Sequence, residues 1–62
     1  MTGQELRTLR LHYGLTHQAI ARHTGRSMST VFRWESSEGR IAWTDVLKLR
    51  LLFMRLAQRG KR

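Results

Sequence analysis

With 62 residues and no cysteine, the chain has room for one domain, residues 1–62, and cannot form disulfides or thiolate metal sites. Twelve Lys and Arg against four Asp and Glu give a formal net charge of +8, which in so small a domain indicates a polyanionic partner. Nothing resembles a signal peptide, and the most apolar run, residues 46–57, contains three cations, so we expect no membrane-spanning segment.

The first predicted helix begins at a capping box, Thr-Gly-Gln-Glu, at residues 2–5. In this motif Thr2 caps the helix and Glu5 reaches back to the backbone N–H of Thr2. Residues at helical spacing form its buried face, namely Leu6, Leu9 and Tyr13, with Arg10 on the same side. Gly14 then ends the helix.

Residues 16–36 predict two short helices joined by a tight turn at residues 23–26. Thr16 and Ser27 stand where N-caps are needed, and Gly25 supplies the positive φ that the turn requires. The inward-facing residues of the two helices are Ile20, Ala21, Val31 and Trp34. This pattern predicts a helix-turn-helix.

The second of these helices, from about residue 28 to 36, is predicted to expose side chains that contact bases. Arg33 can pair bidentately with guanine, Ser29 can bond several bases, and Met28 can contact a thymine methyl group. Phe32 can do the same, and an aromatic exposed here needs a partner, which is a base, a sugar or another subunit. Its alternative role is packing against the loop that follows.

Contacts to the DNA backbone are expected around this helix. His17 and Gln18 occupy the first turn of the preceding helix, where backbone N–H groups and the positive dipole end attract phosphate. The alternative is that both side chains simply face water. Arg26 and Arg40 are further predicted contacts to the DNA backbone.

A longer helix is predicted from residue 43 to about residue 58, with Asp45 favourable in its first turn. One apolar face comprises Val46, Leu49, Phe53, Leu56 and Ala57, and an adjoining face comprises Leu47, Leu51 and Met54; Lys48, Arg55 and Arg59 lie opposite. A stripe this wide exceeds what one small core needs. We therefore expect the second face to form a homodimer interface, the alternative being one broad face buried in the monomer. The basic tail 59–62 would add non-specific attraction to phosphate.

Together these motifs resemble the Cro and lambda-repressor type of helix-turn-helix domain, the Xre family. The resemblance covers residue 6 to about residue 52. Its carriers are Leu6-x-x-Leu9-Arg10, Gly14-Leu15-Thr16, Ile20-Ala21, Gly25-x-Ser27 and Val31-x-x-Trp34-Glu35. It implies an all-α, lambda-repressor-like fold of four helices, with five as the alternative, whose second motif helix lies in the major groove and whose dimers read two half-sites.

By this resemblance, base reading falls on Met28, Ser29 and Arg33, and a salt bridge joins Arg10 to Glu35. The resemblance also places Ser27 and Thr30 at positions that contact the DNA backbone or the edge of the groove. His17 stands where the family often has a glutamine that contacts phosphate. Relatives commonly have a proline near residue 42 and a small residue near residue 50, before a separate fifth helix. Here the last helix runs on, so the dimer geometry of relatives is not transferable.

The function predicted is a sequence-specific regulator that binds double-stranded DNA. It would be a homodimeric repressor of its own or a neighbouring phage or mobile-element operon, including operons beside anti-CRISPR genes. Its expected location is the cytoplasm of a bacterial or phage-infected cell, at the nucleoid. The alternative is an antitoxin-like interaction protein whose last helix binds a different polypeptide. A basic membrane peptide, third, does not explain the capped helix-turn-helix.

An enzyme is not expected, because the four acids are scattered and no nucleophile constellation or phosphate-binding loop is present. His12, His17 and His23 are not spaced as metal ligands on one helix, so we expect no metal, cofactor or small-molecule ligand. Double-stranded RNA is disfavoured because its deep, narrow major groove does not admit such a helix.

Overall fold

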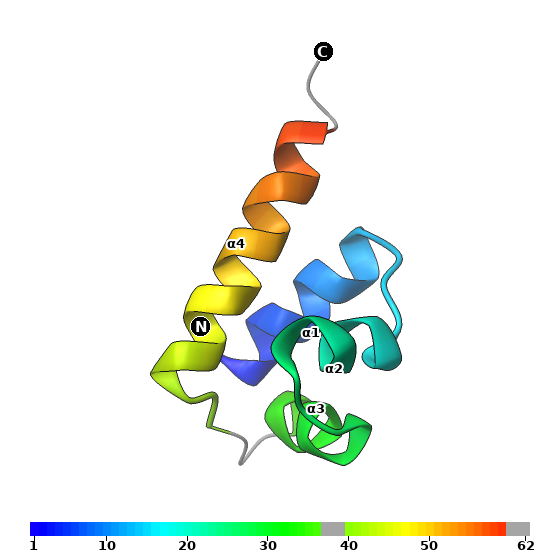
Figure 1. The fold of residues 1–62 in the computed structure, drawn as a ribbon. Helices are drawn as coiled ribbons and strands as arrows, with labels where there is room; N and C mark the ends of the chain where they lie inside the picture. The colour runs from blue at the N-terminus through cyan, green and yellow to red at the C-terminus, as the bar shows by residue number, and fades with distance from the viewer. Residues whose placement is uncertain (37–39, 60–62) are drawn as a thin grey trace.

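The computed structural model describes residues 1–36 and 40–59. Its elements are α1 (Gly3–His12), α2 (His17–Thr24), α3 (Met28–Glu35) and α4 (Trp43–Arg59), and the described residues contain no strand. Helices α1 to α3 gather beside the first turns and the middle of α4, and the last turns of α4 extend beyond them (Figure 1). The predicted all-α, four-helix fold is confirmed. Residues 60–62 of the predicted basic tail lie outside the described residues.

Three hydroxyl side chains cap the first three helices, as predicted. Thr2 accepts a hydrogen bond from the backbone N–H of Glu5 at 3.1 Å, and Thr16 accepts one from Ala19 at 3.1 Å. Ser27 accepts one from the N–H of Thr30 at 3.3 Å. One detail differs, since the Glu5 carboxylate lies 3.4 Å from the Thr2 hydroxyl, where the capping-box pattern predicts a bond to the backbone N–H. Each cap satisfies a backbone donor that the helix itself cannot pair.

Glycines end the first two helices. Gly14, with φ 66°, follows α1, and Gly25, with φ 73°, is the C-cap of α2. Both residues have the left-handed conformation that costs glycine nothing because it has no Cβ. The turn between α2 and α3 therefore forms as the sequence predicts.

The core lies where the four helices meet and holds nearly all the side chains predicted for it. Its buried members are Leu6, Ile20, Ala21, Val31, Trp34, Leu49 and Phe53. Tyr13 stacks on Phe53 with ring centroids 5.9 Å apart, which joins the end of α1 to α4. Leu56 is half-buried, but Ala57 is exposed because it lies on the part of α4 that extends past the other helices, so its predicted burial is wrong.

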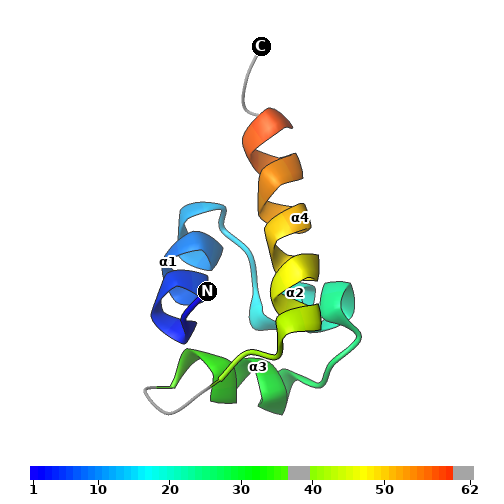
Figure 2. The ribbon, with the colours of Figure 1, turned by 90° about the vertical axis from the view of Figure 1, so that its left-hand side faces the viewer.

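Gly3, at the start of α1, is buried against the end of α3. A Cβ placed on Gly3 would overlap the backbone carbonyl oxygen of Trp34. The backbones of α1 and α3 approach as closely as a residue without a side chain allows. This contact sets the position of α3, which lies across the ends of α1 and α4 in Figure 2.

Helix α4 runs without interruption for 17 residues. The fifth helix of relatives therefore has no separate counterpart within residues 40–59. Throughout the part of the chain that the structure describes, every helix is too short or too polar to cross a membrane.

Candidate nucleic-acid interface

The outer face of α3 presents the four residues predicted to contact bases. Met28 is 44% exposed and Phe32 is 51% exposed, and Ser29 and Arg33 are exposed beside them. Their spacing, i, i+1, i+4 and i+5, places them on one side of the helix, opposite the buried Val31 and Trp34. This face offers a cation, a hydroxyl and two apolar groups, which are the chemistries that distinguish base pairs in the major groove.

Two predicted backbone contacts at the start of α3 are already bonded to each other. The hydroxyls of Ser27 and Thr30 lie 3.0 Å apart, and the Ser27 hydroxyl also caps the helix. Ser27 is exposed and Thr30 is half-buried. Their positions are therefore fixed, with Ser27 the more accessible of the two.

Arg10 and Glu35 join α1 to the end of α3. The guanidinium Nε donates to Glu35 Oε2 at 2.8 Å and a terminal nitrogen donates to Oε1 at 3.1 Å. The remaining terminal nitrogen donates to the backbone carbonyl of Leu15 at 3.1 Å. The two side chains are only 11% and 8% exposed. This two-point pair is the salt bridge that the family resemblance implies, and it holds α3 at a fixed angle to α1.

His17, in the first turn of α2, faces the protein as well as solvent. Its Nε2 lies 3.3 Å from Glu35 Oε1, and its side chain is 22% exposed. The imidazole also stacks on the Phe32 ring, with centroids 4.1 Å apart and planes inclined by 29°. Within the part of the chain that the structure describes, Phe32 thus has a partner in α2. The sequence alone gave no signal for this contact between helices.

Arg26, in the turn of the motif, is paired with Asp45 at the start of α4. Its Nε lies 3.2 Å from Asp45 Oδ2 and a terminal nitrogen lies 3.1 Å from the same oxygen. The Asp45 side chain is 2% exposed, whereas the Arg26 side chain is 48% exposed. The sequence predicts Arg26 as a DNA-backbone contact and gives no sign of this pairing with Asp45. Asp45, which the sequence explains only by the helix dipole, proves to be a buried ion-pair partner.

A second set of contacts fastens α2 to α4. The Nε2 of His23 lies 2.9 Å from the backbone oxygen of Lys48, and a carbonyl oxygen can only accept, so Nε2 carries the proton. In return, the Lys48 ammonium donates to the backbone carbonyl of Thr24 at 3.3 Å. The end of α2 and the middle of α4 are thus bonded in both directions.

The remaining predicted backbone contacts, Gln18 and Arg40, are exposed. Gln18 lies in the first turn of α2, where backbone N–H groups are directed outward and the helix dipole favours an anion. Arg40 lies between α3 and α4. Neither side chain forms a hydrogen bond or ion pair with another described residue.

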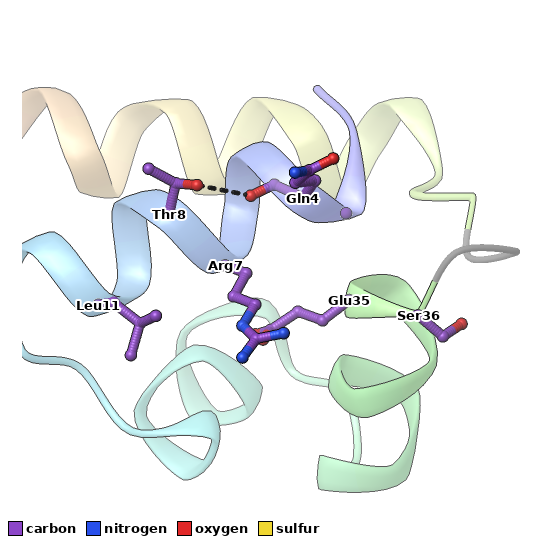
Figure 3. A pocket seen from close by; sticks show the side chains of 7 residues that line it. Gln4, Arg7, Thr8, Leu11, Glu35 and Ser36 are labelled. Atoms are coloured by element: carbon purple, nitrogen blue, oxygen red, sulfur yellow. Dashed lines mark hydrogen bonds between the residues drawn. The ribbon is translucent and has the colours of Figure 1, made fainter.

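A shallow pocket lies between α1 and the end of α3 (Figure 3). Thr8 donates to the backbone carbonyl of Gln4 at 3.0 Å, and Glu35 is committed to Arg10 and His17. Arg7 extends into the space between the helices. Among the described residues, no three His, Asp or Glu side chains gather closely enough to hold a metal ion.

The outer face of α4 carries a row of exposed apolar side chains. Leu47, Leu51 and Met54, predicted as a dimer interface, are 48%, 47% and 57% exposed. Trp43, predicted only as the start of the helix, extends this row and is 66% exposed. Exposed cations flank the row, namely Lys48, Arg50 and Arg55.

A capped α2, a glycine turn and an exposed, chemically mixed α3 define the helix-turn-helix class of DNA-binding domain. A family model described as "Helix-turn-helix domain" matches residues 2–50, and the chain therefore belongs to this family. Membership agrees with the resemblance to the Cro and Xre type, and the family is typically non-enzymatic. No curated protein and no solved structure matches the chain significantly.

Proposed function

We propose that the protein is a sequence-specific transcriptional regulator that lays α3 in the major groove of double-stranded DNA. The observation that carries this proposal is the exposed row of base-reading chemistry on α3, Met28, Ser29, Phe32 and Arg33, on a helix whose position two flanking ion pairs fix. The net charge of +8 supports it, because phosphate neutralisation supplies much of the affinity for DNA. Gln18, Ser27, Thr30 and Arg40 contact the DNA backbone. His17 and Arg26 lie next to these contacts.

The regulator acts as a homodimer on an inverted repeat. Exposed Trp43, Leu47, Leu51 and Met54 form a row about 16 Å long, given a rise of 1.5 Å per residue. Exposing such an apolar row to water is unfavourable for a domain this small unless another surface covers it. A second copy of α4 matches it in length and chemistry, and a two-fold dimer presents two copies of α3 to two half-sites.

The biological role we propose is repression. A dimer bound at a promoter excludes the polymerase, and the resemblance to the Cro and lambda-repressor type supports a repressor of its own or a neighbouring phage or mobile-element operon. Its place of action is the nucleoid, in the cytoplasm of a bacterial or phage-infected cell. No cofactor or small-molecule ligand enters this mechanism.

Selection of bound fragments from a random pool of double-stranded DNA tests the reading function. We expect the wild type to select a two-fold symmetric consensus. Arg33→Ala should lower affinity for that consensus about 10- to 100-fold per half-site and change binding to unrelated DNA little. Arg7→Ala, which removes an exposed arginine of α1, is the matched control. Equal losses on specific and unrelated DNA would show that Arg33 does not read bases.

Sizing of the purified protein by light scattering tests the dimer. The wild type should be dimeric, and Leu51→Glu should be monomeric because it places two carboxylates in an apolar contact. Leu11→Glu, at a leucine of α1 that is 58% exposed, is the control and should leave the dimer intact. The exposed row of α4 also favours a second candidate, an antitoxin-like protein whose α4 binds a different polypeptide. A wild type that is monomeric at all concentrations would favour that candidate.

A further inference from the structure

Phe32 is the one large apolar side chain on the outer face of α3 whose orientation a second helix controls. One side of its ring is covered by the His17 imidazole at a centroid distance of 4.1 Å, and the side chain as a whole remains 51% exposed. An isolated exposed phenylalanine would sample several rotamers. The stack reduces that choice, because only an arrangement with the rings nearly parallel keeps the contact.

The His17 ring is also held at its edge, by Glu35. Glu35 Oε1 lies 3.3 Å from Nε2, and because an ionised carboxylate can only accept, Nε2 is the donor. Glu35 is in turn held by two hydrogen bonds from Arg10, at 2.8 Å and 3.1 Å. A chain of contacts thus runs from α1 through α3 and α2 and ends on the exposed phenyl ring of Phe32.

This arrangement assigns different roles to the two exposed apolar residues of α3. Met28 has three rotatable bonds and adapts to what it meets. Phe32, held against His17, presents a rigid apolar surface at a fixed place beside Arg33. A fixed apolar surface in the major groove has one specific partner among the base edges, the 5-methyl group of thymine.

We propose that His17 is a positioning residue that holds Phe32 against the 5-methyl group of a thymine in each half-site. The inference rests on the proposed function and names the base that Phe32 contacts, thymine, and the chemical group on that base, the 5-methyl. It also divides the role of His17 in two. The ring positions Phe32, and the backbone N–H in the first turn of α2 stays directed toward phosphate. The stack, not the hydrogen bond to Glu35, is the element that Phe32 requires.

Replacing thymine by uracil tests this directly, because the exchange removes the methyl group and keeps every hydrogen-bonding edge. In the consensus selected by the wild type, thymines are exchanged one symmetric pair at a time, and affinity is measured by fluorescence anisotropy. At the symmetric pair of thymines that Phe32 contacts, the exchange for uracil should weaken wild-type binding about fourfold per half-site, the effect expected for one buried methyl group. Phe32→Ala should bind the thymine and uracil duplexes equally.

Two variants of His17 separate the stack from the hydrogen bond. His17→Phe keeps an aromatic ring against Phe32 and loses the bond to Glu35, so it should retain the fourfold preference for thymine. His17→Gln keeps an amide donor for Glu35 and loses the ring, so it should lose the preference. The ratio of the two affinities is insensitive to a general loss of stability, since both duplexes meet the same folded protein, and circular dichroism verifies that each variant is folded.

Retention of the thymine preference by His17→Gln, or its loss in His17→Phe, would overturn the proposal. So would a wild type that binds its consensus tightly but tolerates uracil at every position; in that case the regulator function stands and only the inference fails. A wild type that selects no consensus at all would instead overturn the proposed function.

Discussion

Two carboxylates anchor the helix-turn-helix to the rest of the molecule, and their surroundings differ. Glu35, at the end of α3, meets Arg10 of α1, and both side chains are nearly buried, at 8% and 11% exposure. Asp45, at the start of α4, is 2% exposed, but its partner Arg26 is 48% exposed. The first pair is buried on both sides, and the second is a buried acid covered by a half-exposed base.

This difference determines what each pair contributes. A pair buried on both sides is costly to break from either end, because either loss leaves a poorly hydrated charge without its ion-pair partner. In the second pair, loss of Asp45 leaves an arginine that water can still reach, whereas loss of Arg26 leaves a carboxylate in the interior. We therefore expect the α1–α3 junction to respond symmetrically to substitution and the turn–α4 junction asymmetrically.

The largest expected effect comes from Arg10→Met. It leaves Glu35 with only His17 as a partner and leaves the Leu15 carbonyl without its donor, so the free energy of unfolding should fall by about 3–5 kcal/mol. That is comparable with the whole stability of a domain this size, roughly 3–9 kcal/mol. Urea denaturation followed by circular dichroism measures it.

The double variant Arg10→Met with Glu35→Leu is the control. Replacing both charges by apolar side chains removes the unpaired carboxylate, so part of the lost stability should return. A double variant that is no more stable than Arg10→Met alone would show that the cost lies in lost packing and not in an unpaired buried charge.

An intermediate effect is expected at the second junction, where the two single variants should differ. Arg26→Met leaves the Asp45 carboxylate buried and unpaired, at a cost of about 2–3 kcal/mol. Asp45→Asn keeps an acceptor and leaves Arg26 partly hydrated, at a cost of about 1 kcal/mol or less. Urea denaturation of both variants checks the order, and equal losses would contradict the asymmetry.

The smallest effect concerns DNA and separates Arg26 from Arg40. The variant Arg26→Gln with Asp45→Asn keeps the net charge and leaves no buried charge unpaired. If Arg26 serves Asp45 rather than phosphate, this variant should leave the slope of log affinity against log salt within about 0.3 of the wild type. Arg40→Gln should reduce that slope by about 1. A reduction of about 1 in the double variant would return Arg26 to the set of phosphate contacts.

Local chemistry explains why so much of the fold could be predicted. Thr2, Thr16 and Ser27 act on N–H groups three residues ahead, and Gly25 acts on its own φ, so their roles are visible in short stretches of sequence. The buried face of α4 follows from helical periodicity in the same way, up to the point where the helix leaves the body.

Contacts between helices, by contrast, could not be predicted from short stretches of sequence. The sequence pattern places Asp45 in the first turn of the last helix and Arg26 in the turn of the motif. It does not show that the two side chains meet, because the angle between the helices decides that contact. The stack of His17 on Phe32 is likewise a product of how α2 crosses α3. Only the family resemblance predicts the pairing of Arg10 with Glu35, because the resemblance implies how the helices are arranged.

Helix α4 is bonded to α2 near its middle, through His23 and Lys48, and then continues past the other helices (Figures 1 and 2). In the proposed dimer, its exposed row sets the distance between the two copies of α3, and α3 sets the bases that are read. A substitution in either place can alter its own surface and leave the other unchanged. A lineage can thus acquire a new operator spacing while its half-site sequence stays constant, or change the half-site while the spacing is preserved.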